Sequence, residues 1–188
     1  MKMENLEKKT VAILATNGFE ESELSEPKKA LEEAGADVHI VSLESGEIKG
    51  WKNGNWSNSY KVDKTLDEVS QSNYNALMLP GGLINPDLLR RNDKAIGFVK
   101  SFFENKKPVA AICHAPWLLA EADVLKGRKV TSFSSIKTDI ENAGAQWVNQ
   151  EVVVDEGLVT SRSPEDLPAF NKKLVEEVYE GKHKMQTA

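Results

Sequence analysis

The feature that most constrains the fold is a short apolar run that ends at the only cysteine of the chain and continues directly into a helical pattern. Residues 108–112 read Pro-Val-Ala-Ala-Ile, Cys113 follows, and residues 114–120 have the composition of a helix. A buried strand that turns at once into a helix forms a nucleophile elbow, and the residues flanking such a bend must be small. Ala111 and Ala115 meet this requirement. The sequence therefore predicts that Cys113 projects from a strand–helix junction.

Two interpretations of Cys113 remain open at this point. In an elbow, the free N–H groups and the positive dipole end of the new helix favour the thiolate and lower the pKa of the thiol, which predicts a reactive cysteine. Unpaired cysteine is also among the most buried residue types, so Cys113 could instead be a small hydrophobic residue of a core strand. A single cysteine cannot form a disulfide within the chain, and we expect a reducing, cytoplasmic environment.

Apolar segments alternate with amphipathic ones along the chain. Runs without polar alternation, mostly followed by helical patterns, are typical of a parallel sheet with helices on both faces. The expected strands are residues 11–15, 38–43, 76–79 and 109–112, and the expected helices are residues 21–34, 93–105, 114–120, 136–143 and 164–179. Turn signals predict two hairpins, at residues 44–61 on the sheet edge and at residues 152–160. We expect one α/β domain over residues 1–188, a doubly wound, flavodoxin-like sandwich with an ordered core of about residues 10–180 and a frayed tail.

Composition argues against several classes of function. The formal net charge is −5 and acidic and basic residues are interleaved, so no basic patch is available for nucleic acid. No apolar stretch approaches the roughly 18 residues of a spanning helix, and we expect neither a membrane segment nor a signal peptide. No spacing of His, Cys and acidic residues resembles a metal-ligand set, and no glycine-rich nucleotide-binding fingerprint occurs. We therefore expect no metal and no other cofactor.

Two glutamates fall on the face of the first expected helix that should be buried. A period of 3.6 residues puts Glu20 and Glu23 on the apolar stripe, whereas Glu21 falls on the outer side. Glu20 lies in the first turn, where the helix dipole favours acids near solvent, so a role as a secondary acid stays open. Glu23 lies deeper, and Pro27 four residues later removes a backbone hydrogen bond and bends the helix. A carboxyl group in such a place has a raised pKa and, when protonated, can donate a hydrogen bond to a thiolate.

A pair of glycines follows the third expected strand, at the same sheet edge as Cys113. Gly81 and Gly82 permit positive φ and a close approach of the backbone, so their N–H groups could face an oxyanion, although double glycine is also a common turn. His114 is the one plausible base, because the other two histidines lie within an expected strand and in the tail. Neighbours across an elbow point in different directions, so contact between Cys113 and His114 does not follow from adjacency.

These motifs, in this order, resemble the PfpI intracellular-protease family, in the superfamily that also holds the Parkinson-linked deglycase and the class I glutamine amidotransferases. The resemblance covers about residues 11–178. It rests on residues 19–23 (Phe-Glu-Glu-Ser-Glu), 79–82 (Leu-Pro-Gly-Gly), 111–116 (Ala-Ile-Cys-His-Ala-Pro) and 159–167 (Val-Thr-Ser-Arg-Ser-Pro-Glu-Asp-Leu). The four motifs together are specific to the family and much less specific about the substrate.

The resemblance implies roles for particular residues. Cys113 is the implied nucleophile, Glu23 the buried acid bonded to its sulfur and His114 the base, with oxyanion contacts from the N–H groups of Gly82 and His114. In the peptidase-like branch, an acid after the Pro-Gly-Gly turn orients the histidine across a subunit interface, which implies a homodimer or a higher homo-oligomer. Asp87 is the matching residue, but it is Asp where the family has Glu, and one extra residue precedes it. Asp87 could equally be a first-turn acid of a short helix.

Three functions are compatible with these residues. The first is a stress-protective cysteine enzyme acting on reactive carbonyls, in which Cys113 adds to an aldehyde such as methylglyoxal and a hydroxy acid is released, a glyoxalase- or deglycase-like reaction. The second is intracellular peptide hydrolysis by Cys113, His114 and Asp87. The third is a redox sensor or holding chaperone in which Cys113 is oxidised to the sulfinate. The expected partner is accordingly a small carbonyl compound or a peptide.

Overall fold

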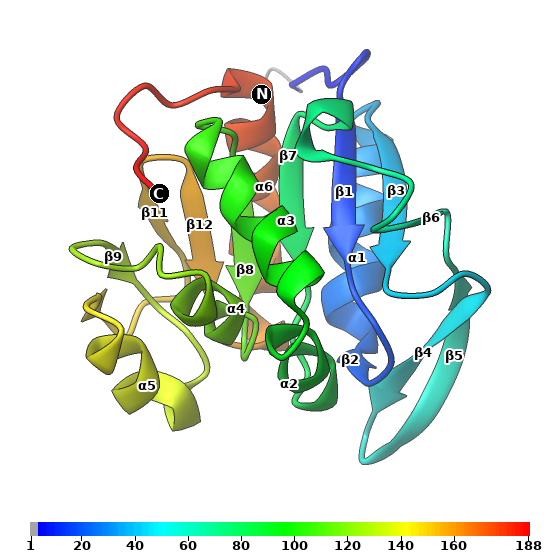
Figure 1. Cartoon of the computed structure of the whole chain (residues 1–188), viewed down its shortest axis with the longest axis horizontal. Coiled ribbons are helices and arrows are strands. Elements are labelled where there is room, and N and C mark those ends of the chain that lie inside the picture. Colours follow the sequence, from blue (N-terminus) through cyan, green and yellow to red (C-terminus); the bar gives the residue numbers. More distant parts are fainter. Residues whose placement is uncertain (1–3) are drawn as a thin grey trace.

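A seven-stranded sheet forms the centre of the computed structural model, which describes residues 4–188 (Figure 1). Its strands are β1 Thr10–Leu14, β3 Asp37–Ser42, β6 Lys64–Thr65, β7 Ala76–Leu79, β8 Val109–Ile112, β11 Val153–Asp155 and β12 Leu158–Ser161. Their order in the sheet is β11-β12-β8-β7-β1-β3-β6, and neighbours are parallel except for the antiparallel pair β11 and β12. The four strands predicted from apolar runs are confirmed, and they occupy the adjacent positions β8, β7, β1 and β3.

Alternate residues of the central strands enter separate cores on the two faces of the sheet. In β1, Ala12 and Leu14 join one core, whereas Val11 and Ile13 join the other. Burial on both faces requires an unbroken apolar run rather than an alternating pattern. This is why these strands could be recognised in the sequence.

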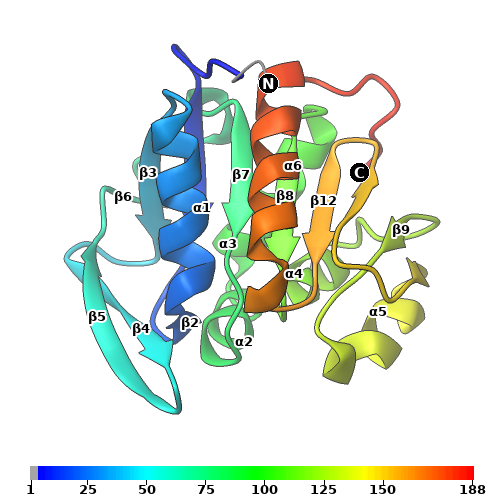
Figure 2. The same ribbon diagram turned by 180° about the vertical axis from the view of Figure 1, so that it is seen from behind.

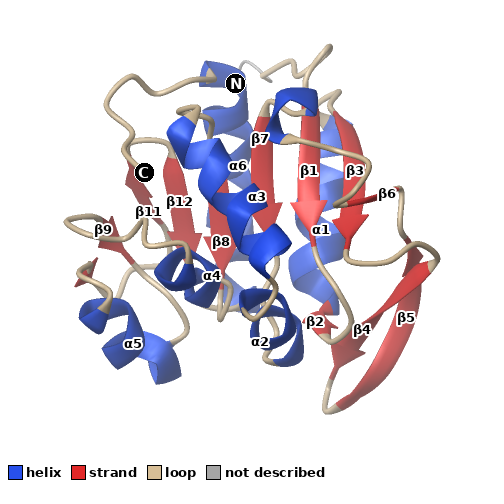
Figure 3. Cartoon of the chain, viewed as in Figure 1, coloured by secondary structure: helices blue, strands red, loops and turns tan. Residues whose placement is uncertain are grey.

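Helices cover both faces of the sheet, as the α/β prediction requires (Figure 3). They are α1 Glu21–Glu33, α2 Ile84–Arg90, α3 Asp93–Glu104, α4 Pro116–Glu121, α5 Lys137–Asn142 and α6 Leu167–Glu180. The helices α1 and α6 lie side by side on one face (Figure 2), and α3 and α4 cover the other. The five expected helices are confirmed, and the short helix α2 follows the Pro-Gly-Gly turn. Within residues 4–188, none of the helices combines the length and apolar character needed to cross a bilayer.

Both expected hairpins are present. The first consists of β4 Glu47–Lys52 and β5 Asn55–Lys61, which form a separate three-stranded sheet with β2 Phe19–Glu20. This sheet projects past the β3 side of the main sheet and lies over the start of α1 (Figure 1). The second hairpin consists of β11 and β12, and β12 pairs in parallel with β8. A two-stranded sheet of β9 Lys129–Val130 and β10 Gln146–Trp147 was not predicted, because two-residue strands leave no recognisable period.

The C-terminal tail, which we expected to be frayed, packs against the rest of the domain. The backbone N–H of His183 donates to the carbonyl of Lys106 at 3.0 Å, and the buried Gln186 donates from Nε2 to the carbonyl of Lys107 at 3.0 Å. Both carbonyls lie in the loop between α3 and β8. The tail therefore packs against the loop that follows α3.

Candidate active site

Cys113 lies in the strand–helix junction that the sequence predicted. Its φ is +65°, a left-handed conformation that is uncommon for a residue other than glycine. Two hydrogen bonds hold it there: its N–H donates to Ser161 O at 3.0 Å, and its carbonyl accepts from Phe133 N at 2.8 Å. The flanking Ala111 and Ala115 are fully buried. Backbone strain of this kind persists only where the surroundings fix it, and it is typical of functional sites.

The side chain of Glu23 lies beneath the elbow and is fully buried. Its Oε2 accepts a hydrogen bond from the N–H of Gly81 at 2.9 Å. Burial raises the pKa of Glu23 to about 8, the hydrogen bond with Cys113 opposes this shift, and the charge of Glu20 adds to it. The carboxyl group is therefore largely protonated at neutral pH, and it lies next to Cys113 across Gly81.

The glycine pair is required by this close packing. A Cβ on Gly81 would lie 2.5 Å from Glu23 Oε2 and 2.6 Å from Cys113 Cβ. Gly82 has φ +78°, and a Cβ there would lie 2.6 Å from the carbonyl oxygen of Gly18. Only glycine lets this turn approach both the acid and the sulfur.

The pKa of Cys113 is raised, in contrast to the expectation of a thiol acidified by the elbow helix. Burial is the largest cause and the charge of ionised Glu23 adds to it, while the N–H groups of Gly82 and His114 lower the pKa. The helix α4 is only six residues long and begins three residues after Cys113, so its dipole acts weakly on the sulfur. Deprotonation of the thiol therefore needs both a base and a protonated Glu23.

The side chain of His114 contacts that of Cys113, which adjacency in the sequence alone did not establish. Its Nδ1 lies 3.2 Å from Cys113 Sγ, and its Nε2 lies 3.1 Å from Ser135 Oγ. The ring stacks on Phe133, with centroids 4.7 Å apart, and meets the edge of Trp117 at 5.2 Å. Burial lowers the pKa of His114, which keeps the imidazole neutral at pH 7. A neutral imidazole next to a thiol can accept its proton.

A model of the DJ-1/PfpI family matches residues 9–177 of the chain. The chain belongs to the DJ-1/PfpI family. It is 47% identical over 165 residues to YraA of Bacillus subtilis, which is named as a candidate cysteine protease, and the match covers 88% of this chain and 95% of YraA. It is 45% identical over 168 residues to protein/nucleic acid deglycase 2 of Escherichia coli, covering 89% and 96% of the two chains.

Solved structures agree with this membership of the DJ-1/PfpI family. DJ-1beta of Drosophila melanogaster has a TM-score of 0.82 and 28% sequence identity to the chain, with 91% of this chain and 90% of that one covered. The family and the α/β fold predicted from the sequence are confirmed. The names of the relatives indicate an enzyme of the DJ-1/PfpI family.

Within the described residues, Asp87 makes no hydrogen bond with Cys113 or His114. It is exposed in the first turn of α2. Among the described residues, the partners of the His114 ring nitrogens are Cys113 and Ser135. A role for Asp87 across a subunit interface stays a prediction.

The burial of the acids at the start of α1 differs from what the helical period predicted. Glu20 is half-buried next to the helix, and burial together with the charge of Glu21 raises its pKa. Glu21 was expected on the outer side, and this is wrong, because the hairpin β4–β5 covers the start of α1. Its carboxylate accepts two hydrogen bonds from Asn58, from N and Nδ2, each at 3.1 Å. Glu21 therefore holds the hairpin rather than facing solvent.

Sequence reasoning missed the fully buried Asn85, whose side chain connects the start of α2 to two loops at the site. Its Oδ1 accepts from Thr16 N at 2.8 Å, and its Nδ2 donates to Pro80 O at 2.9 Å and to Gly81 O at 3.2 Å. Ser135 and Phe133 were also missed, because they reach His114 from a segment about 20 residues further along the chain. A single polar residue before a proline carries no signal of such contacts.

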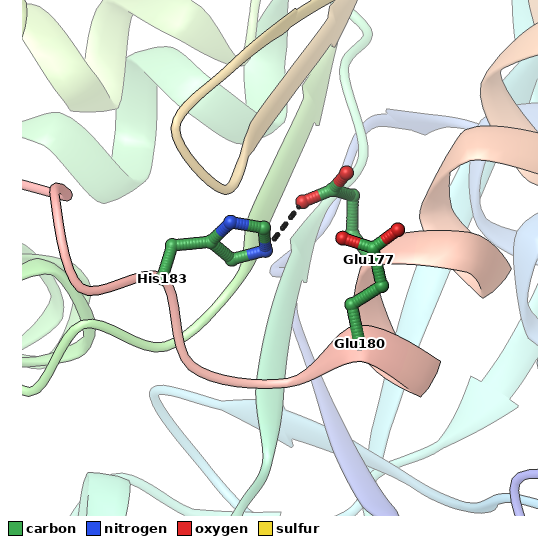
Figure 4. Close-up of side chains that lie close together, drawn as sticks. All are labelled: Glu177, Glu180 and His183. Atoms are coloured by element: carbon green, nitrogen blue, oxygen red, sulfur yellow. Dashed lines mark ion pairs between the residues drawn. The ribbon is translucent and has the colours of Figure 1, made fainter.

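One cluster outside this site has the chemistry of metal ligands. Glu177, Glu180 and His183 each bring one ligand atom within 4.8 Å of the others, at the end of α6 (Figure 4). His183 Nε2 lies 2.7 Å from Glu177 Oε2. Two ligands around one zinc ion lie about 3.3 Å apart, given bond lengths near 2.0 Å. The shorter distance fits an ion pair that fastens the tail to α6 better than it fits a cation site.

Proposed function

We propose that the chain is a stress-protective cysteine enzyme that converts a reactive carbonyl such as methylglyoxal to a hydroxy acid. The observation that carries the proposal is the group of a buried thiol, a carboxyl group whose pKa is raised to about 8 and a neutral imidazole 3.2 Å from the sulfur. At neutral pH the carboxyl group can donate a proton and the imidazole can accept one. The deglycase name of the Escherichia coli relative supports the same chemistry.

The reaction begins when His114 Nδ1 takes the thiol proton and the sulfur adds to the aldehyde carbon. The carbonyl oxygen becomes the hemithioacetal oxygen, receives its proton from Glu23 and faces the N–H groups of Gly82 and His114. A proton then moves from the former aldehyde carbon to the neighbouring ketone carbon, with His114 and Glu23 as carriers. The hemithioacetal becomes the thioester of a hydroxy acid, and no external oxidant or reductant is needed.

Water completes the cycle. It attacks the thioester carbon, the sulfur leaves with a proton, and lactate is released when the substrate is methylglyoxal. A free thiol suits a reducing, cytoplasmic compartment, where the substrate would be a small carbonyl compound. On the family resemblance, we also propose that the protein is a homodimer or a higher homo-oligomer.

Peptide hydrolysis is the second candidate, and the name of YraA together with the Cys113–His114 contact favours it. In that reaction a carboxylate must fix the imidazole, and Asp87 of another subunit would have to reach His114 Nε2. A third candidate, a redox sensor or chaperone in which Cys113 is oxidised to the sulfinate, needs no turnover.

Parallel assays separate these candidates. Purified wild type, Cys113→Ser and Asp87→Asn are incubated with methylglyoxal and, separately, with a fluorogenic peptide. We expect lactate to form in proportion to methylglyoxal lost, no product from Cys113→Ser, and a rate within about threefold of wild type for Asp87→Asn, a barrier change below about 1 kcal/mol.

Other outcomes would reject the carbonyl proposal. Cleavage of the peptide without lactate formation favours the peptidase. A hundredfold lower rate of methylglyoxal consumption in Asp87→Asn favours the triad of Cys113, His114 and Asp87. Inactivity on both substrates, with a thermal stability that depends on oxidation, favours the sensor.

A further inference from the structure

The imidazole of His114 makes a hydrogen bond on the side away from Cys113, and the family resemblance assigns no role to this contact. His114 has two ring nitrogens with different neighbours: Nδ1 faces Cys113 Sγ and Nε2 faces Ser135 Oγ. We propose that Ser135 is the positioning residue that selects the tautomer of His114 from within the same chain. This inference rests on the proposed function only for the choice of His114 as base.

The chemistry of a neutral imidazole gives the reason. Such a ring carries one N–H and one lone pair, and the hydrogen bond made by one nitrogen determines which form is present. To accept the thiol proton, Nδ1 must hold the lone pair, so the N–H must lie on Nε2. Ser135 Oγ lies 3.1 Å from Nε2, where it can accept from that N–H, and in this direction the hydrogen bond stabilises the competent tautomer.

The other neighbours of the ring cannot make this selection. Phe133 and Trp117 hold the plane of the imidazole, but a ring flipped about its Cβ–Cγ bond would stack on them equally well. Two charged groups contact Trp117 rather than the imidazole: Arg90 lies over the indole ring at 5.1 Å, and Asp139 accepts from Trp117 Nε1 at 2.8 Å. On the elbow side, Cys113 Sγ faces Nδ1 rather than Nε2.

The position of Ser135 suits this role. It lies in the short helical turn Ser134–Ile136, directly after Phe133, whose N–H donates to the carbonyl of Cys113 at 2.8 Å. One segment tied to the elbow therefore brings both the stacking ring and the hydroxyl to His114. Ser135 itself is exposed, so its replacement removes a hydroxyl without opening a cavity in the core.

A hydroxyl also has a different electrostatic effect from the carboxylate expected at this place. A carboxylate next to Nε2 favours the imidazolium, whereas a hydroxyl can accept from the Nε2 N–H without adding charge. Together with the burial that lowers the pKa of His114, Ser135 keeps the resting pair as thiol and neutral imidazole. Within the chain, the hydrogen bond at Nε2 comes from Ser135 and not from Asp87, which is exposed on α2.

The test compares Ser135→Ala with Ser135→Thr, which keeps a hydroxyl, and with Ser134→Ala, an exposed neighbour in the same turn. Steady-state rates on methylglyoxal and the nitrogen chemical shifts of His114 by long-range ¹H–¹⁵N NMR are measured. For Ser135→Ala we expect kcat to fall about tenfold or more with KM within about twofold, and the proton to move toward Nδ1. Ser135→Thr should stay within about threefold of wild type and Ser134→Ala should match it.

The NMR measurement keeps this proposal separate from the proposed function. If wild type does not consume methylglyoxal, the tautomer of His114 and the rate of Cys113 alkylation at pH 7 still report the role of Ser135, and a tautomer change with slower alkylation in Ser135→Ala supports it. The proposal is overturned if Ser135→Ala retains the Nε2–H form and the wild-type alkylation rate. It is also overturned if Asp87→Asn, rather than Ser135→Ala, shifts the tautomer, since the orienting group would then come from another subunit.

Discussion

Replacing Glu23 with Gln should change how the stability of the protein depends on pH. In the folded protein the pKa of Glu23 is raised from its ordinary value of 4.5 to about 8, chiefly by burial. Between these values the folded state binds a proton that the unfolded state has released, so stability falls as the pH rises. At about 1.4 kcal/mol per pKa unit, the full loss is at most roughly 5 kcal/mol.

Gln is isosteric with Glu and stays neutral over this pH range. Its carbonyl oxygen can accept the N–H of Gly81, as Glu23 Oε2 does at 2.9 Å, and its amide can donate to the sulfur of Cys113. The variant should therefore fold, and its free energy of unfolding relative to wild type should rise steadily from about pH 5 to about pH 8.

Urea unfolding at several pH values between 5 and 9 measures this difference. The matched control is Glu26→Gln, an exposed glutamate on the same helix, for which the difference from wild type should be small at each pH. Glu21 is unsuitable as a control because it anchors the hairpin through Asn58. A Glu23→Gln difference that is constant between pH 5 and 9 would refute the raised pKa and the protonated acid in the proposed reaction.

Three further predictions follow from the geometry. Alkylation of Cys113 by iodoacetamide should show its pH inflection above the free-thiol value of about 8.5, and Glu23→Gln should lower the inflection because the like charge is gone; an inflection well below 8.5 in wild type contradicts the burial argument. Gly81→Ala should destabilise the protein by about 2 kcal/mol or more in urea, since the added Cβ would lie 2.5 Å from Glu23 Oε2, and an unchanged midpoint counts against the packing described. Gln186→Ala should cost about 1–2 kcal/mol by leaving the carbonyl of Lys107 without its donor, whereas Met185→Ala, exposed in the same tail, should be neutral; equal effects would mean that the tail is not docked.

The central sheet could be predicted because its signal is local. Strands such as β7 and β8 are buried on both faces, so an apolar run of four residues shows directly in the sequence. The elbow could also be predicted, since a strand, a cysteine and small flanking residues are contiguous. Glu23 was found for a similar reason: its position in the helical period put it on the face that packs against the sheet.

The remaining contacts of the site depend on segments that meet only in the folded chain. The hairpin that buries Glu21 comes from residues 47–61, and nothing in the period of α1 reports it. Ser135 reaches His114 from beyond β9, and the amide of Asn85, at the start of α2, bonds to the loops that follow β1 and β7. Each is a short polar residue in a turn, a setting in which the same residue types usually face solvent.

The wrong expectation for the Cys113 pKa clarifies how the proposed nucleophile would be activated. A helix dipole acting alone would hold a resting thiolate, but burial and the nearby carboxyl group favour the thiol. The two groups in contact with Cys113 have pKa values shifted in opposite directions, upward for Glu23 and downward for His114, so both are neutral near pH 7. Opposed shifts of this kind assign the acid and the base in an active site. The thiolate would then form only as His114 accepts its proton, which makes the tautomer held by Ser135 as important to the reaction as the cysteine itself.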